Sequence, residues 1–135
     1  MVTTSKALFT DNCAEITYDD ANGIIIAKWS GFLKLDSTKK GCESMVEFVK
    51  KNKTTKHLSD QSTLKVLSKE VQGYLVTEAF PALDKAGLRK LAVLVSEDVF
   101  AKATVENVNT NATKMGNITV KTFNTRRDCI DWLNE

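Results

Sequence analysis

Two patterns of apolar and polar positions alternate along this chain, and the first predicts strands. Apolar residues either alternate with polar ones or form short continuous runs, as they do in half-buried and fully buried strands. Such stretches lie at residues 13–18, 24–29, 57–59, 91–95 and 117–123. The polar residues 1–12 are expected to form a loose arm, with a short edge strand at 7–9 as the alternative.

The second pattern, with apolar residues every three or four positions, predicts helices. These stretches lie at residues 36–52, 68–86 and 126–133. A further helix is expected to begin behind Ser96 and to restart at Thr104 as far as Ala112. Ser68 and Thr125 have the residue type and position of N-caps.

Glycine and proline positions refine these boundaries. Asn22-Gly23 predicts a tight hairpin turn, and Ser30-Gly31 is expected to end the strand that follows it. Gly41 lies inside a helix, where it lowers helix stability but permits close packing on a sheet. Pro81 is predicted to kink or divide the 68–86 helix, and Gly87 to end it.

The order of elements predicts an α/β fold. After the opening hairpin, each strand is joined to the next by a helical crossover, which is the connection that parallel strands require. We therefore expect a mostly parallel five-stranded sheet with one antiparallel N-terminal strand and helices on both faces. A chain of 135 residues fits one domain, spanning residues 1–135.

Composition narrows the functional class. The 19 Lys and Arg against 17 Asp and Glu leave a net charge of +2, far from the basic field that nucleic-acid binding requires. No apolar run approaches a membrane span or the core of a secretion signal. The three cysteines have no CxxC spacing, so we expect reduced thiols and a cytoplasmic location.

The segment from Lys56 to Ser68 holds the only histidine and a run of polar residues where open α/β sheets usually bind their ligands. We predict a polar loop here, with a partner-binding surface formed by Ser59, Asp60, Gln61, Ser62 and Thr63. A catalytic triad of His57, Ser59 and Asp60 is not favoured. Strand residues two apart are separated by roughly 6.6 Å, and Asp60 would point to the opposite face.

Other chemistry is weakly indicated. The sequence has no glycine-rich phosphate loop. A metal site would need Cys13, Cys42, His57 and Cys129 to converge from distant elements, so no metal or cofactor is expected. Four aromatic residues either line an apolar pocket or belong to the core. These are Trp29, Phe32, Tyr74 and Phe80.

Three segments carry a resemblance to a known family. They are ITYDDANGIIIAKWSGFLK (16–34), HLSDQSTLKVLSKEVQGYL (57–75) and FPALDKAGLRKLAVLVSEDVF (80–100). Together with residues 123–133 they cover nearly all of the chain. The pattern resembles the SpoIIAA-like subgroup of the STAS superfamily, the anti-sigma-factor antagonist domains, whose fold is related to CRAL-TRIO lipid-binding domains. Many members of this subgroup have no established function.

The resemblance also implies a candidate phosphoacceptor. In signalling STAS proteins a partner kinase phosphorylates a Ser at the helix start after the third strand, within an Asp-Ser-Ser-Gly-like motif. Ser68 matches this position topologically, although the preceding Asp and the following Gly are absent here. Asp60-Gln61-Ser62 resembles the motif in part but lies earlier in the chain.

Three functions follow, in order of preference. The first is a non-enzymatic regulatory module that binds another protein, or a second copy of itself, through residues 56–68 and the helix behind them. The second is a carrier or sensor that holds a small apolar or lipid-like ligand between the sheet and the helix that Pro81 interrupts. The third is a hydrolase. The first two functions can be distinguished by whether the protein binds a protein partner or a small molecule.

Overall fold

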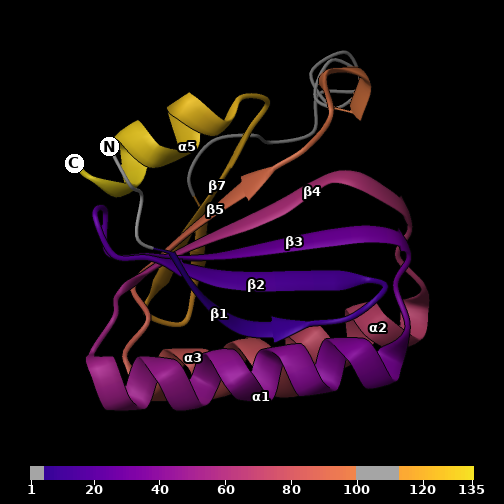
Figure 1. Ribbon diagram of the computed structural model, residues 1–135, viewed down its shortest axis with the longest axis horizontal. Coiled ribbons are helices and arrows are strands. Elements are labelled where there is room, and N and C mark those ends of the chain that lie inside the picture. Colours follow the sequence, from indigo (N-terminus) through magenta and orange to yellow (C-terminus); the bar gives the residue numbers. More distant parts are fainter. Residues whose placement is uncertain (1–4, 100–112) are drawn as a thin grey trace.

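A computed structural model describes residues 5–99 and 113–135 of the chain. In these residues the strands form one seven-stranded sheet in the order β1-β2-β3-β4-β5-β7-β6 (Figure 1). The strands are β1 Ser5–Thr10, β2 Ala14–Asp19, β3 Ile24–Phe32, β4 Lys56–Val66, β5 Lys90–Leu94, β6 Thr113–Met115 and β7 Ile118–Phe123. The inner strands β3, β4, β5 and β7 are parallel, whereas β1, β2 and β6 pair antiparallel.

All five predicted strands are present, but the sheet is mixed and larger than predicted. The short apolar stretch of residues 7–9 belongs to β1, an edge strand that pairs with β2. At the other edge, Gly116 turns the chain with a φ of 64°, so that β6 pairs with β7. β6 has only three residues and no apolar alternation, which is why sequence pattern did not reveal it.

Two inner strands run further than predicted. The structure extends β4 over 11 residues, so most of the predicted polar loop is strand. β3 likewise continues through Ser30 and Gly31, which were expected to end it, because irregularities in its pairing with β4 absorb them. Gly31 takes a φ of 63°, a conformation that glycine adopts at little cost.

Helices cover both faces of the sheet, as predicted (Figure 1). One face carries α1 Leu35–Asn52 and a continuous helical stretch of α2 Lys69–Tyr74, η1 Leu75–Ala79 and α3 Phe80–Ala86; the other carries α5 Arg126–Leu133. η1 is a π-helical turn in which Phe80 N–H donates to Leu75 O, five residues back. Pro81 follows directly, so the predicted interruption takes the form of a widened turn rather than a break.

Two apolar layers result. The larger packs α1, α2 and α3 on the sheet, where Gly41 lies so close that a Cβ would be 2.8 Å from Ile16 Cδ1. The smaller packs α5 on the other face around Leu58, Cys129 and Leu133. The predicted helix behind Ser96 begins at residue 97, and its predicted continuation from Thr104 to Ala112 lies outside the described residues.

Candidate functional site

β3 and β4 extend beyond their neighbours as a two-stranded parallel ribbon. β2 pairs with β3 only as far as Trp29, and β5 pairs with β4 only as far as Asp60. Beyond these points β3 and β4 continue to pair with each other up to Phe32 and Val66. We call residues 30–34 and 63–69 the ribbon tip; it lies at the carboxyl end of the parallel strands (Figure 1).

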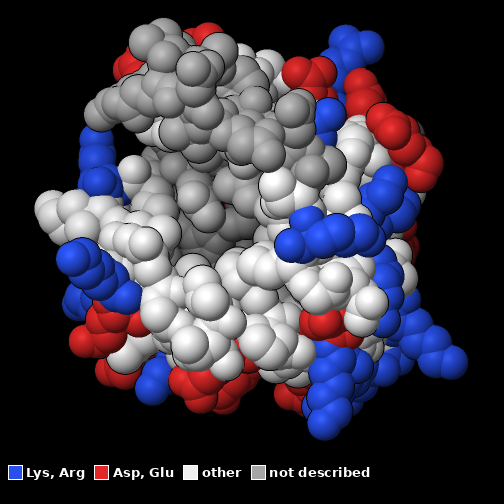
Figure 2. Space-filling model, turned by 180° about the vertical axis from the view of Figure 1, so that it is seen from behind, with Lys and Arg blue, Asp and Glu red and all other residues white. Residues whose placement is uncertain are grey.

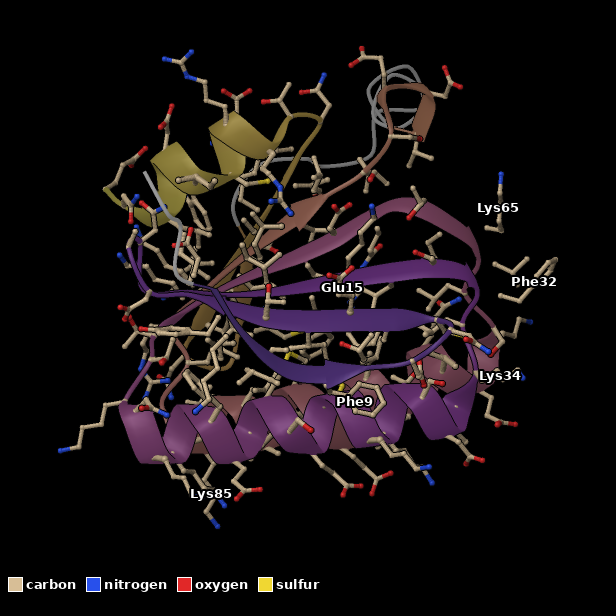
Figure 3. All side chains as sticks on the ribbon, in the orientation of Figure 1. Phe9, Glu15, Phe32, Lys34, Lys65 and Lys85 are labelled. Carbon is tan, nitrogen blue, oxygen red and sulfur yellow. The ribbon has the colours of Figure 1, made fainter. Side chains whose placement is uncertain are left out.

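The ribbon tip exposes two large apolar side chains beside each other. Phe32 is 71% exposed and Val66 is 44% exposed, and the two residues are partners in the β3–β4 register. In Figure 3 Phe32 projects from the end of the sheet, with Lys65 on one side and Lys34 on the other. A large aromatic side chain this exposed retains most of its apolar area for contact with another surface.

Charge at the ribbon tip is predominantly positive. Lys34, Lys65 and Lys69 are all exposed. The nearest acidic side chains along the chain, Asp36 and Glu70, lie in the first turns of α1 and α2, where the helix dipole favours them.

The five residues predicted as a partner-binding loop are strand residues of β4 and do not form one exposed surface, so the predicted loop is wrong, while their binding of a partner stays a prediction. Ser59 and Asp60 are buried, on opposite faces of β4. Ser59 Oγ accepts a hydrogen bond from Trp29 Nε1 at 3.1 Å, and Gln61 Nε2 approaches the same oxygen at 3.5 Å. Thr63 is the exposed member of the five and donates to Trp29 O at 3.3 Å.

Asp60 makes its hydrogen bonds to the chain beside it. Its Oδ1 accepts hydrogen bonds from the backbone N–H of Ser62 at 3.0 Å and from Ser62 Oγ at 2.6 Å. On the α5 side, Arg126 Nη2 lies 3.9 Å from Asp60 Oδ2. The two bonds to Ser62 fix the backbone of β4 at the point where β5 no longer supports it.

Ser68 is the N-cap of α2, as predicted. Its Oγ accepts a hydrogen bond from Val71 N–H at 3.2 Å, and Glu70 lies in the first turn. The residue is exposed and follows Val66 by two positions, so it belongs to the ribbon tip. Whether Ser68 is phosphorylated stays a prediction.

His57 is buried under the helices, with its Nδ1 2.9 Å from the carbonyl oxygen of Ile25. Burial lowers the pKa of His57 to about 4, although the hydrogen bond to Ile25 acts in the opposite direction. The imidazole is therefore neutral at physiological pH. His57 and Ser59 share one face of β4 and Asp60 has the other, as strand alternation requires.

The predicted aromatic quartet is divided among three places. Trp29 and Phe80 line an internal cavity of about 30 Å³ together with His57 and Ser59, a volume close to that of one water molecule. Phe32 is exposed instead, because it lies past the end of β2 and α5 does not reach this end of the sheet. Tyr74 lies in a separate surface groove.

That groove runs between α1 and the α2–α3 stretch and was not predicted. It has a volume of about 300 Å³ and an apolar base that includes Val46, Ala79 and Ala82. Its other lining residues are Cys42, Glu43, Glu47, Lys50, Tyr74 and Glu78. The spacing of Glu43 and Glu47 on one helix face was a visible signal, but only the structure shows which helix packs beside them.

The comparisons with known proteins agree with this architecture. No protein-family model and no curated protein matches the sequence. A solved structure does match: an uncharacterized protein of the DUF3478 family from Shewanella loihica PV-4, described as having a SpoIIAA-like fold. The two share 15% sequence identity with a TM-score of 0.57, over 96% of this chain and 92% of that one. The chain has a SpoIIAA-like fold.

This fold confirms the predicted resemblance at the level of architecture. In the described residues, no helix is both long and apolar enough to cross a membrane. Nor do three or more His, Cys, Asp or Glu side chains of these residues come together as a metal-binding group.

Proposed function

We propose that this SpoIIAA-like chain is a non-enzymatic regulatory module of STAS type that binds another protein through its ribbon tip. The observation that carries the proposal is the exposed pair of Phe32 and Val66, side by side on two paired strands. Aromatic side chains at the centre of an interface contribute much of its binding energy, and flanking charges guide the approach of a partner.

The surroundings of the polar residues support a non-enzymatic role. His57 is neutral, buried and bonded to a backbone carbonyl, and Ser59 Oγ accepts from the Trp29 indole. Both side chains thus hold the sheet and its core together. A serine activated as a nucleophile would need a base within hydrogen-bond reach, and Asp60 lies on the opposite face of β4.

Ser68 provides the regulatory part of the proposal. Phosphorylation would add about two negative charges next to Lys65 and Lys69, and so would cancel most of the positive charge of the ribbon tip. The N-terminal backbone of the helix stabilises a phosphate at this position. A partner that recognises the bare tip would then be released.

The carrier function is not favoured by the interior. The cavity between the sheet and α3 holds about 30 Å³, whereas pockets for small molecules typically measure about 300–1,000 Å³. A lipid-like ligand would require the apolar layer of α1 and α3 to separate from the sheet.

A photo-crosslinking amino acid at position 32 tests the proposal in cells of the source organism. We expect a specific protein adduct that disappears when Lys34 and Lys65 are both changed to Glu. Position 76 is the matched control, because Val76 is 62% exposed but lies on the helical stretch, away from the tip. Equal adducts at positions 32 and 76, or none at 32, would contradict the proposal.

A further inference from the structure

The groove between α1 and the α2–α3 stretch combines an apolar base with an acidic rim. Glu43 and Glu47 come from α1 and Glu78 from η1, and Lys50 is the cation among the lining residues. Glu47 Oε1 is paired with Lys51 Nζ at 3.0 Å, and Lys39 Nζ lies 5.8 Å from the centre of the Tyr74 ring, so Glu43 and Glu78 are the carboxylates left for a partner. Burial raises the pKa of Tyr74 to about 12, with smaller contributions from the neighbouring Cys42, Glu43 and Glu78. The Tyr74 hydroxyl therefore stays neutral. From behind, acidic side chains recur along the lower, helix-covered side of the molecule, interspersed with lysines (Figure 2).

The ribbon tip has the complementary properties. Phe32 and Val66 project from it as an apolar knob, and Lys34, Lys65 and Lys69 surround the knob with positive charge. A groove of about 300 Å³ has the volume of roughly ten water molecules, which is sufficient for an aromatic ring but not for a helix. The two surfaces are both partly apolar, and their charges are opposite in sign.

A chain cannot bring its own tip into its own groove. Lys34 is the N-cap of α1, so the tip is joined directly to the start of that helix, while the groove lies further along it. Phe32 points away from the end of the sheet, whereas α1 and α3 lie across its face (Figures 1 and 3). Contact between the two surfaces therefore requires two molecules.

We propose that the ribbon tip of one copy inserts Phe32 into the groove of a second copy, with the tip lysines facing the groove glutamates. The inference rests on the proposed function, since it names a second copy of this chain as a partner of the tip. The contact is heterologous because it joins two different surfaces. In a dimer, one copy therefore retains a free groove and the other a free tip. Association then continues beyond dimers unless the geometry closes a ring.

The proposed contact buries little surface, so we expect its affinity to be low. A knob of two side chains with a few exposed ion pairs falls below the roughly 1,200 Å² that stable interfaces bury. We expect self-association at protein concentrations on the order of 0.1–1 mM, weakened several-fold by salt on the order of 0.5 M.

Sedimentation velocity with complementary variants tests the proposal. The tip variant carries Phe32→Ser. The groove variant carries both Glu43→Lys and Glu78→Lys. All three substitutions replace exposed side chains. Wild-type protein should form larger species as its concentration rises, whereas each variant alone should stay monomeric. An equimolar mixture of the two should form dimers and nothing larger, because one intact tip then meets one intact groove. The control Val76→Ser should associate as wild type does.

Three results would overturn the inference: a wild-type protein that stays monomeric to about 1 mM, variants that still assemble alone, or a mixture that gives no dimer. These results leave the proposed function testable by itself. A position-32 adduct with a different protein, together with a monomeric wild type, would reject self-association and retain the tip as an interaction surface. No adduct and no self-association would reject both.

Discussion

At the scale of single residues, His57 links the stability of this SpoIIAA-like fold to pH. Its pKa is about 4 in the folded chain against an ordinary value of 6.5, because the ring is buried. Between these pH values the unfolded chain binds a proton that the folded chain does not. The free energy of unfolding therefore rises with pH across this window. As the pH falls from about 6.5 to about 4, the folded protein loses this stability.

We expect His57 to account for about 3 kcal/mol of stability lost between about pH 6.5 and pH 4. His57→Asn keeps a donor for the Ile25 carbonyl but cannot be protonated. Urea unfolding at a series of pH values should show a smaller acid-induced loss in the variant than in the wild type. Parallel pH profiles for the two proteins would show that other groups cause the loss.

Gly41 and Gly73 are both helical glycines, and their surroundings predict opposite effects of substitution. A Cβ at Gly41 would lie 2.8 Å from Ile16 Cδ1 and 3.3 Å from Trp29 Cη2, whereas nothing lies within 4 Å of one at Gly73. Gly41→Val should destabilise the protein by about 1–3 kcal/mol through overpacking. Gly73→Ala should stabilise it by up to about 1 kcal/mol through helix propensity. Urea midpoints measure both, and equal effects would contradict the packing role of Gly41.

At the scale of elements, two side-chain caps fix where helices begin. Ser68 accepts from Val71 N–H and Thr125 accepts from Asp128 N–H, each at 3.2 Å. Replacing either by Ala should cost about 1 kcal/mol, whereas Ser68→Asp should preserve the cap. Chemical denaturation measures these changes. A loss for Ser68→Asp as large as for Ser68→Ala would indicate that the hydroxyl has another role.

These caps show which elements the sequence could predict. Helix starts depend on local hydrogen bonds, so Ser68 and Thr125 were recognisable from residue type and spacing alone. The length of β4 depends instead on pairing with β3, thirty or more residues away, and no local signal marks Gln61 or Leu64 as strand. The polar run was read as a loop because its hydrogen-bond partners are distant in the sequence.

Contacts between distant parts of the sequence also limited the prediction of the candidate site. Only the last residues of the segment 56–68 lie at the carboxyl end of the parallel strands, because the segment begins at the first residue of β4, and its polar side chains are largely occupied within the fold. The large apolar side chain exposed at this end of the sheet is Phe32, a residue type that is usually buried in the core. Its exposure follows from its position past the end of β2 and α5, and only the relative lengths of several elements determine that.

At the scale of the whole molecule, two apolar layers of unequal size lie on opposite faces of the sheet. α1 has 18 residues and packs together with α2 and α3, whereas α5 has eight residues and is the described helix of the other face. Lys90 Nζ reaches the end of α5 and donates to Trp132 O at 3.1 Å. The smaller layer has less buried apolar area to lose, so we expect it to open first.

Two cysteines report on these layers separately, because Cys42 is buried under α1 and Cys129 under α5. Burial first, with nearby acidic groups second, raises the pKa of each thiol to about 12, so neither reacts in the closed protein. In a Cys13→Ala background at low urea, pulse labelling with a thiol reagent should modify Cys129 faster than Cys42. Lys90→Ala should widen the difference, since it frees the end of α5. Equal labelling rates would instead mean that both layers open together in one global unfolding step.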